Sequence, residues 1–145
     1  MRIRKAVVAL SISAVAVASA GAAFAFWTTS GAGTGSATSA SANGTLALSA
    51  SFANGLAPGQ AEDVTYHAVN GSATDLRVGT VHAAVSTDNA DCLPGWFSIG
   101  DVVSNQVIPG HSEADLTLKG SLAFNNNAAN QDPCKGAKVT LTLSS

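Results

Sequence analysis

The side chains with the clearest potential for acid-base or metal chemistry are three histidines, His67, His82 and His111. No two of them stand at a short spacing such as His-x-x-x-His. A metal site needs several ligands that converge on one ion, and widely separated histidines do not predict such convergence. We therefore expect three separate surface histidines, no metal centre and no bound cofactor.

A second group of polar residues offers the oxygen ligands that calcium requires. These residues lie in two loops, each next to a cysteine, and comprise Asp88, Asn89, Asp91, Asn127 and Asp132. Ca²⁺ binds about six to eight oxygen atoms, which two adjoining loops could supply together. Asn and Asp are also common in loops because their side chains hydrogen bond to nearby backbone groups. We favour this loop role and keep calcium binding as the alternative.

Neither serine nor cysteine stands in a motif of nucleophilic catalysis. The sequence contains no Gly-x-Ser-x-Gly, no Ser-x-x-Lys and no His-Glu-x-x-His. The two cysteines, Cys92 and Cys134, predict a disulfide if the chain is exported to an oxidising compartment. Such a bridge would stabilise the fold by about 4 kcal/mol on the chain-entropy argument. We predict no catalytic residue, and we expect that the protein is not an enzyme.

The N-terminus carries the features of a secretory signal peptide over residues 1–25. Three basic residues precede an apolar run from Ala6 to Ala20. Signal peptidase could cut after Ala20 or after Ala25, and we favour Ala25. An uncleaved anchor is the competing interpretation, because the apolar stretch continues to Trp27. Its content of Ala, Gly and Ser favours cleavage, so we expect a secreted, extracellular or cell-surface protein.

Removal of the signal peptide leaves an acidic chain long enough for one domain. Four basic residues then face nine acidic ones, for a net charge of −5. Attraction between basic side chains and phosphate is the main source of non-specific affinity for nucleic acid, so this composition argues against such a partner. Contact with a membrane would come only through an uncleaved signal region.

Residues 26–44 consist almost entirely of Thr, Ser, Gly and Ala. They predict a flexible arm in front of the folded domain. Phe26 and Trp27 are the only large apolar side chains in this segment and could anchor it to a second copy of the chain. The arm would then add as a strand to an open sheet edge and build chains of molecules. A simple spacer is the alternative, and we favour it.

From Thr45 onward, alternation of apolar and polar residues predicts about seven short strands. The clearest alternation runs from Leu116 to Phe124, and another places Val139, Leu141 and Leu143 on one face. No part of the domain has helical periodicity. We predict an all-β, immunoglobulin-like antiparallel β-sandwich over residues 45–145, with the disulfide closing one end.

Two glycine positions predict specific backbone features. Asn70-Gly71 is the dipeptide of a tight two-residue turn, so we expect a β-hairpin there, although Asn70-Gly71-Ser72 also matches a glycosylation sequon. Gly79 stands where the apolar phase of a long strand changes, and this change predicts a β-bulge.

Residues 23–31 and 130–142, with the Gly/Ser/Thr run after the first stretch, resemble small exported proteins of high-GC Gram-positive bacteria, most of which have no assigned activity. The signal region is also similar to that of biofilm-matrix fibre proteins and camelysin-type surface proteins. This resemblance implies export through a dedicated signal peptidase and a β-sandwich fold. No zinc motif is present that would carry over a peptidase activity.

The sequence therefore favours a non-catalytic structural or adhesive protein of the cell surface or extracellular matrix. Its expected partners are other copies of itself or components of the cell envelope. The alternatives are a small secreted ligand-binding module and, less favoured, an uncharacterised secreted hydrolase.

Overall fold

Alternation at a period of two residues builds the longest strands of the domain. In the strand at the C-terminus, Val139, Leu141 and Leu143 are buried, while their neighbours along the strand are more exposed. Successive side chains of a strand point to opposite faces, so this pattern packs one face on a core and leaves the other in water. The predicted inward face of this strand is confirmed.

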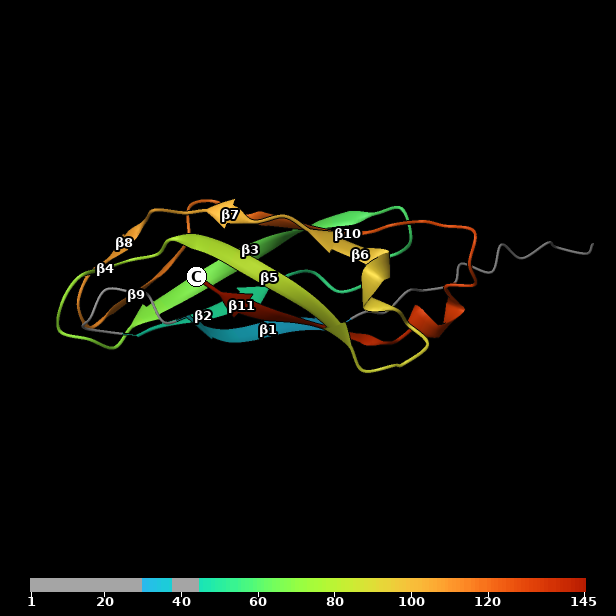
Figure 1. Ribbon diagram of the computed structural model, residues 1–145, viewed down its shortest axis with the longest axis horizontal. Helices are drawn as coiled ribbons and strands as arrows, with labels where there is room; N and C mark the ends of the chain where they lie inside the picture. The colour runs from blue at the N-terminus through green and yellow to red at the C-terminus, as the bar shows by residue number, and fades with distance from the viewer. Residues whose placement is uncertain (1–29, 38–44) are drawn as a thin grey trace, which may run out of the picture.

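The structure is a computed structural model that describes residues 30–37 and 45–145 (Figure 1). These residues form eleven strands and two short 3-10 turns, and they contain no α-helix. The strands are β1 Ser30–Ala37, β2 Leu46–Ser51, β3 Ala61–Asn70, β4 Leu76–Arg77, β5 Thr80–Thr87, β6 Phe97–Ile99, β7 Val102–Val103, β8 Val107–Ile108, β9 Ser112–Asp115, β10 Gly120–Phe124 and β11 Lys138–Ser144. The 3-10 turns are η1 Pro94–Trp96 and η2 Asp132–Cys134.

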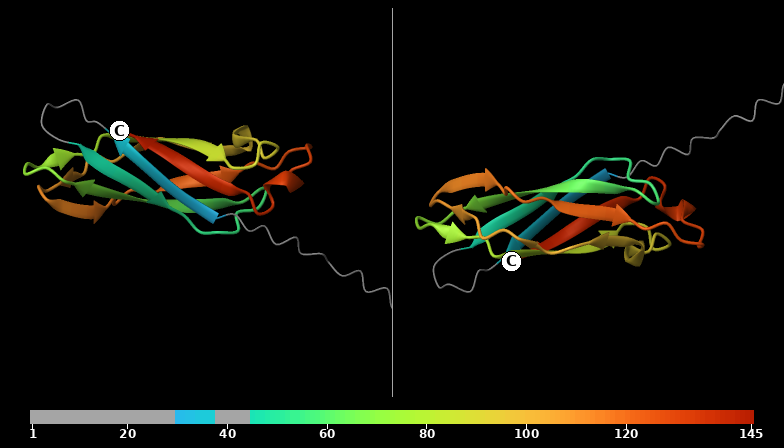
Figure 2. Two further views of the ribbon diagram at one scale, coloured as in Figure 1. Left: turned by 90° about the horizontal axis from the view of Figure 1, so that it is seen from below. Right: turned by 90° about the horizontal axis from the view of Figure 1, so that it is seen from above.

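Nine of the strands form one sheet, in the order β6-β10-β3-β2-β1-β11-β5-β7, with β9 beside β3. The other two strands, β4 and β8, pair with each other. The sheet curls until β5 lies next to β6, so the strands run in two layers along the long axis (Figure 2). Every pairing is antiparallel except that of β1 with β11. The predicted all-β, immunoglobulin-like sandwich is confirmed.

A single hydrophobic core fills the space between the layers. Its largest fully buried side chains are Tyr66, Phe124, Leu46, Leu56, Ile108, Leu122 and Leu141. The rings of Phe97 and Phe124 stack with their centroids 4.4 Å apart. These side chains come from both layers, so the core fixes how the sheet folds over on itself.

The structure corrects the predicted flexible arm. Ser30–Ala37 form β1, which lies between β2 and β11 in the middle of the sheet. The composition of residues 30–37 did not predict this strand. The strand forms because its main chain pairs with two neighbouring strands, and small side chains do not prevent such pairing. The rest of the arm, including Phe26 and Trp27, lies outside the described residues, as does the signal peptide with both cleavage sites.

The predicted hairpin at Asn70-Gly71 is wrong. β3 ends at Asn70, but the next strand, β4, pairs with β8 and not with β3. Neither Asn70 nor Gly71 adopts the positive φ that a tight type I′ turn needs. The chain instead makes a wider loop, and the buried side chain of Asn70 organises it.

Two long predicted strands are each divided in the structure. The run through Gly79 becomes β4 and β5, which belong to different sheets. The face that carries the apolar residues changes because the two strands pair with different partners, and not because of a bulge. The run from Leu116 to Phe124 is broken before β10, and Leu118 is 51% exposed. Residues 45–145 thus hold ten strands where about seven were predicted, and four of the ten are only two or three residues long.

In the segments that the structure describes, no helix has the length and apolar character to cross a membrane.

Candidate functional site

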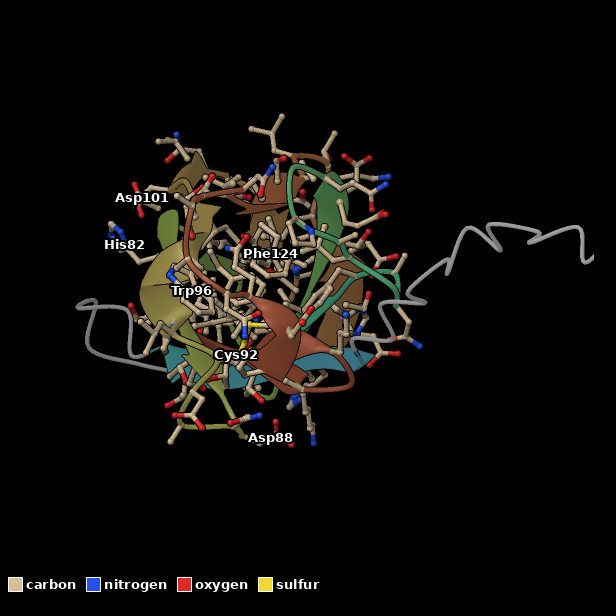
Figure 3. The ribbon with its side chains drawn as sticks, turned by 90° about the vertical axis from the view of Figure 1, so that its right-hand side faces the viewer. His82, Asp88, Cys92, Trp96, Asp101 and Phe124 are labelled. Carbon is tan, nitrogen blue, oxygen red and sulfur yellow. A yellow bond between two sulfur atoms is a disulfide. The ribbon has the colours of Figure 1, made fainter. Side chains whose placement is uncertain are left out.

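The disulfide end of the sandwich brings together the two loops that the sequence analysis singled out (Figure 3). Cys92 and Cys134 are bonded, with their Cα atoms 4.8 Å apart, and both are completely buried. Cys92 follows β5 and Cys134 precedes β11. Since β5 and β11 are antiparallel neighbours, the loop after β5 and the loop before β11 meet at the same end of the sheet. The predicted disulfide at one end of the sandwich is confirmed.

Hydrogen bonds join the same two loops beside the disulfide. The Asn89 side-chain amide donates to the Pro133 carbonyl at 2.8 Å, and the Lys138 N–H donates to Asp88 Oδ1 at 2.7 Å. The Thr87 hydroxyl donates to the Cys92 carbonyl at 2.6 Å. The disulfide is therefore part of a hydrogen-bonded structure at this end of the sandwich.

Most of the calcium candidates already have partners in these loops. Oxygens of Asn89 and Asn127 accept backbone N–H groups two residues further along the chain, at 3.0 and 2.8 Å. Asp132 Oδ1 lies 2.6 Å from Lys135 Nζ. Over residues 30–37 and 45–145, no group of three His, Cys, Asp or Glu side chains is placed to hold a metal ion. Calcium binding stays a prediction, and the geometry points to loop stabilisation.

His67 has two acidic partners that the sequence analysis did not identify. It lies in β3, directly opposite Asp115 in β9, and its Nδ1 is 2.8 Å from Asp115 Oδ1. Its Nε2 is 3.6 Å from Glu113 Oε2. The hydrogen bond to Asp115, with a smaller contribution from Glu113, raises the pKa of His67 above its usual value. Glu113 and Asp115 share a face because they are two residues apart in one strand.

A serine, a histidine and an aspartate occur in one row across this face. Ser49 in β2 lies opposite His67, which in turn lies opposite Asp115. A nucleophilic serine would need a hydrogen bond to the histidine nitrogen that the aspartate leaves free. That nitrogen, Nε2, faces Glu113 instead. The row is an ordered polar surface, and its geometry does not activate Ser49.

The other two histidines lie apart from this surface. His82 Nδ1 is 2.9 Å from Asp101 Oδ1, and both side chains are more than half exposed (Figure 3). His111 occupies a turn with φ of 53°, and its backbone N–H donates to the Ser72 carbonyl. The three histidines thus lie in separate places, although two of them have acidic partners.

Asn70 is a buried polar side chain with several hydrogen bonds, at the end of the sandwich opposite the disulfide. It is 1% exposed, and its Nδ2 lies 2.8 to 3.1 Å from the carbonyl oxygens of Thr74, Ile108 and Pro109. Its Oδ1 accepts the N–H and the hydroxyl of Ser72. Because the amide is buried and bonded, the sequon at Asn70 cannot accept a glycan in the folded state.

Two glutamines hold other loops in the same way. Gln106 Oε1 accepts the N–H and the hydroxyl of Thr117, and its Nε2 donates to the Asp115 carbonyl. Gln131 is 5% exposed and donates to the Asn125 carbonyl at 2.9 Å. Sequence reasoning missed these residues because no local motif distinguishes them.

Tyr66 is the one described side chain whose buried polar atom has no hydrogen-bond partner. The residue is completely buried, and burial raises the pKa of its hydroxyl, with a further contribution from the charge of Asp101. The hydroxyl lies against Gly120, where a Cβ atom would collide with it. This contact explains why β10 begins with a residue that has no side chain.

No protein-family model matches the chain, and no curated protein or solved structure matches it either.

Proposed function

We propose that this protein is an exported, non-catalytic structural or adhesive component of the cell surface or extracellular matrix. The observation that carries the proposal is the use of its polar side chains. Asn70, Asn89 and Gln106 each hydrogen bond to the backbone of another segment of the chain, and Gln131 hydrogen bonds to the backbone of its own loop. The polar chemistry of the domain stiffens both ends of a sandwich.

The disulfide supports the export part of the proposal. Structural disulfides persist mainly in oxidising compartments outside the cytoplasm. The bond between Cys92 and Cys134 is completely buried and closes the end of the domain at which β1 begins. A domain reinforced in this way suits a protein that acts outside the cell.

We further propose that its partners are other copies of the chain or components of the cell envelope, with Phe26 and Trp27 as apolar anchors. The sheet edges support the proposal of self-association. β6 and β7 form the two ends of the strand order, and each is hydrogen-bonded to another strand on one side only. Unpaired strand edges are common sites of contact with other chains.

Fractionation of the producing cells tests the proposal. We expect the protein in the cell-wall or matrix fraction, released by denaturant, and we expect the version with Phe26→Ala and Trp27→Ala to be released more easily. Recovery of all the protein as a soluble monomer in the medium would favour a ligand-binding module instead. Turnover of an ester or peptide substrate panel that is lost in Ser49→Ala or His67→Gln would favour a hydrolase.

A further inference from the structure

The N-terminal strand occupies an unusual position in the sheet. β1 pairs with β2 through six registered positions and with β11 through two. Among the strands that the structure describes, it alone connects the β2 side of the sheet to the β11 side in the pairing order. Without β1, both β2 and β11 would have an unpaired edge facing the same space, and such edges readily accept another strand.

The composition of β1 does not tie it to its own domain. Its sequence is Ser-Gly-Ala-Gly-Thr-Gly-Ser-Ala, so no side chain is larger than threonine. A strand of this kind is held by main-chain hydrogen bonds, and glycine in a strand weakens it further. The β1 strand of a second copy would form the same hydrogen bonds with β2 and β11.

The connection to β2 decides whether such an exchange is possible. Ala37 pairs with Leu46, so eight residues, 38–45, join the two strands. If these residues ran on from β1 to β2 without reversing, they could span up to about 30 Å, at roughly 3.3 to 3.6 Å per residue. That reach is enough to place β1 in the sheet of a neighbouring molecule.

We propose that β1 exchanges reciprocally between two copies of this chain, so that each β1 fills the space between β2 and β11 of its partner. This inference rests on the proposed self-association and names the surface through which it occurs. Reciprocal exchange leaves neither an empty space nor an unpaired donor strand, and it gives a closed two-fold dimer. The dimer repeats the strand pairings of the monomer, but β1 and β2 of one copy then lie in different sheets.

Cysteine cross-linking tests the exchange directly, because Thr34 lies opposite Ser49 in the β1–β2 register. Two single variants of the exported protein, Thr34→Cys and Ser49→Cys, are mixed, partly unfolded together, refolded at high concentration and oxidised gently. We expect a disulfide-linked heterodimer on a non-reducing gel, with a yield that rises with protein concentration. Thr34→Cys mixed with Ser121→Cys is the matched control, since Ser121 lies on β10 and does not pair with β1.

Two further variants keep the outcome decisive. The double variant Thr34→Cys/Ser49→Cys is expected to cross-link within one chain when it is dilute. Deletion of residues 38–45 is expected to raise the dimer fraction at equal concentration, because Ala37 and Leu46, which pair with each other, would then be directly bonded and the chain could not reverse between β1 and β2 within one molecule. Intramolecular cross-linking without any heterodimer, at every concentration, would overturn the exchange.

The same experiments separate this inference from the proposed function. Absence of a cross-link in the double variant would show that β1 does not pair with β2 as described, and it would also overturn the exchange. Retention of the protein in the wall or matrix fraction with no exchange would leave the structural role standing and would place the contact elsewhere. With the double variant at high concentration, a long series of cross-linked species in place of a dimer would contradict the closed, reciprocal form.

Discussion

The hydroxyl of Tyr66 occupies the space that a side chain on Gly120 would need. Gly120→Ala should therefore force the buried ring to shift and lower the free energy of unfolding by about 2 kcal/mol, within the range of overpacked cores. Tyr66→Phe removes a buried hydroxyl that has no partner and should be neutral or stabilising by up to about 1 kcal/mol.

The two changes should be coupled. Chemical denaturation of both single variants and the double variant measures the interaction, and we expect Gly120→Ala to be less harmful when residue 66 is Phe. Gly71→Ala is the matched control, because no atom lies within 4 Å of the Cβ it would add. Equal costs of Gly120→Ala in both backgrounds would show that the hydroxyl is not the obstacle.

Asn70 should be the most sensitive polar residue of the domain. Asn70→Ala leaves the buried carbonyl of Ile108 and its neighbours without a donor, so we expect a loss of about 3 kcal/mol in the free energy of unfolding. Asn126→Ala, at an exposed loop position, should change it by less than about 0.5 kcal/mol. A similar small effect at both positions would show that the hydrogen bonds of Asn70 do not hold the loop after β3 in place.

The disulfide should contribute strongly to stability. Replacement of both Cys92 and Cys134 by Ala opens a cross-link between residues 42 apart and should cost about 4 kcal/mol on the chain-entropy argument. Urea unfolding of the oxidised, reduced and substituted proteins measures this cost. Detection of two free thiols in correctly exported protein would show that the bond does not form in its natural setting.

The pairing of His67 with Asp115 predicts a dependence of stability on pH. The folded-state pKa of His67 is raised, so its contribution is complete below the unfolded pKa of about 6.5 and is lost as pH rises through the folded value. Wild type minus His67→Gln should therefore show a stability advantage in mild acid that declines toward alkaline pH. The pair is partly exposed, so the advantage should remain below about 1 kcal/mol.

Titration of the His67 ring by NMR checks this directly. Asp115→Asn should lower the pKa of His67 more than Glu113→Gln does, because the hydrogen bond to Asp115 is the largest cause of the shift. A pKa at or below the ordinary value in the wild type would rule out the pairing.

Calcium should have little effect on the folded protein. The oxygens of Asn89 and Asn127 already accept backbone N–H groups, and a ligand stabilises only when it binds the native state. Melting temperatures with millimolar Ca²⁺ and with EDTA should agree. A rise on adding Ca²⁺ that disappears in Asp88→Asn would revive the calcium site.

The features that were predicted correctly depend on neighbours in the sequence. Val139, Leu141 and Leu143 alternate with polar residues, so their common face could be identified without knowing what packs on it. β1 could not be predicted in this way, because its Gly, Ser, Ala and Thr residues have no apolar phase and its position is set by β2 and β11. Asn70-Gly71 matched a local turn rule, but burial of the amide decided the outcome.

The candidate site was harder to predict for the same reason. His67 and Asp115 are 48 residues apart, and their contact depends on the register of β3 with β9. No short-range pattern encodes that register. The disulfide was the exception, because composition alone left only one possible pair of cysteines.

The pairing of β1 with β11 has a consequence for when the protein can fold. Ser30 pairs with Lys138, which follows it by 108 residues, so the sheet joins its first strand to its last. Contacts between residues so distant in the chain form late and slow the folding of small domains. For a chain that crosses a membrane N-terminus first, the sheet cannot close until the final strand has emerged. If this chain is exported in that way, its topology would keep it open enough to be threaded, and folding would be completed on the far side.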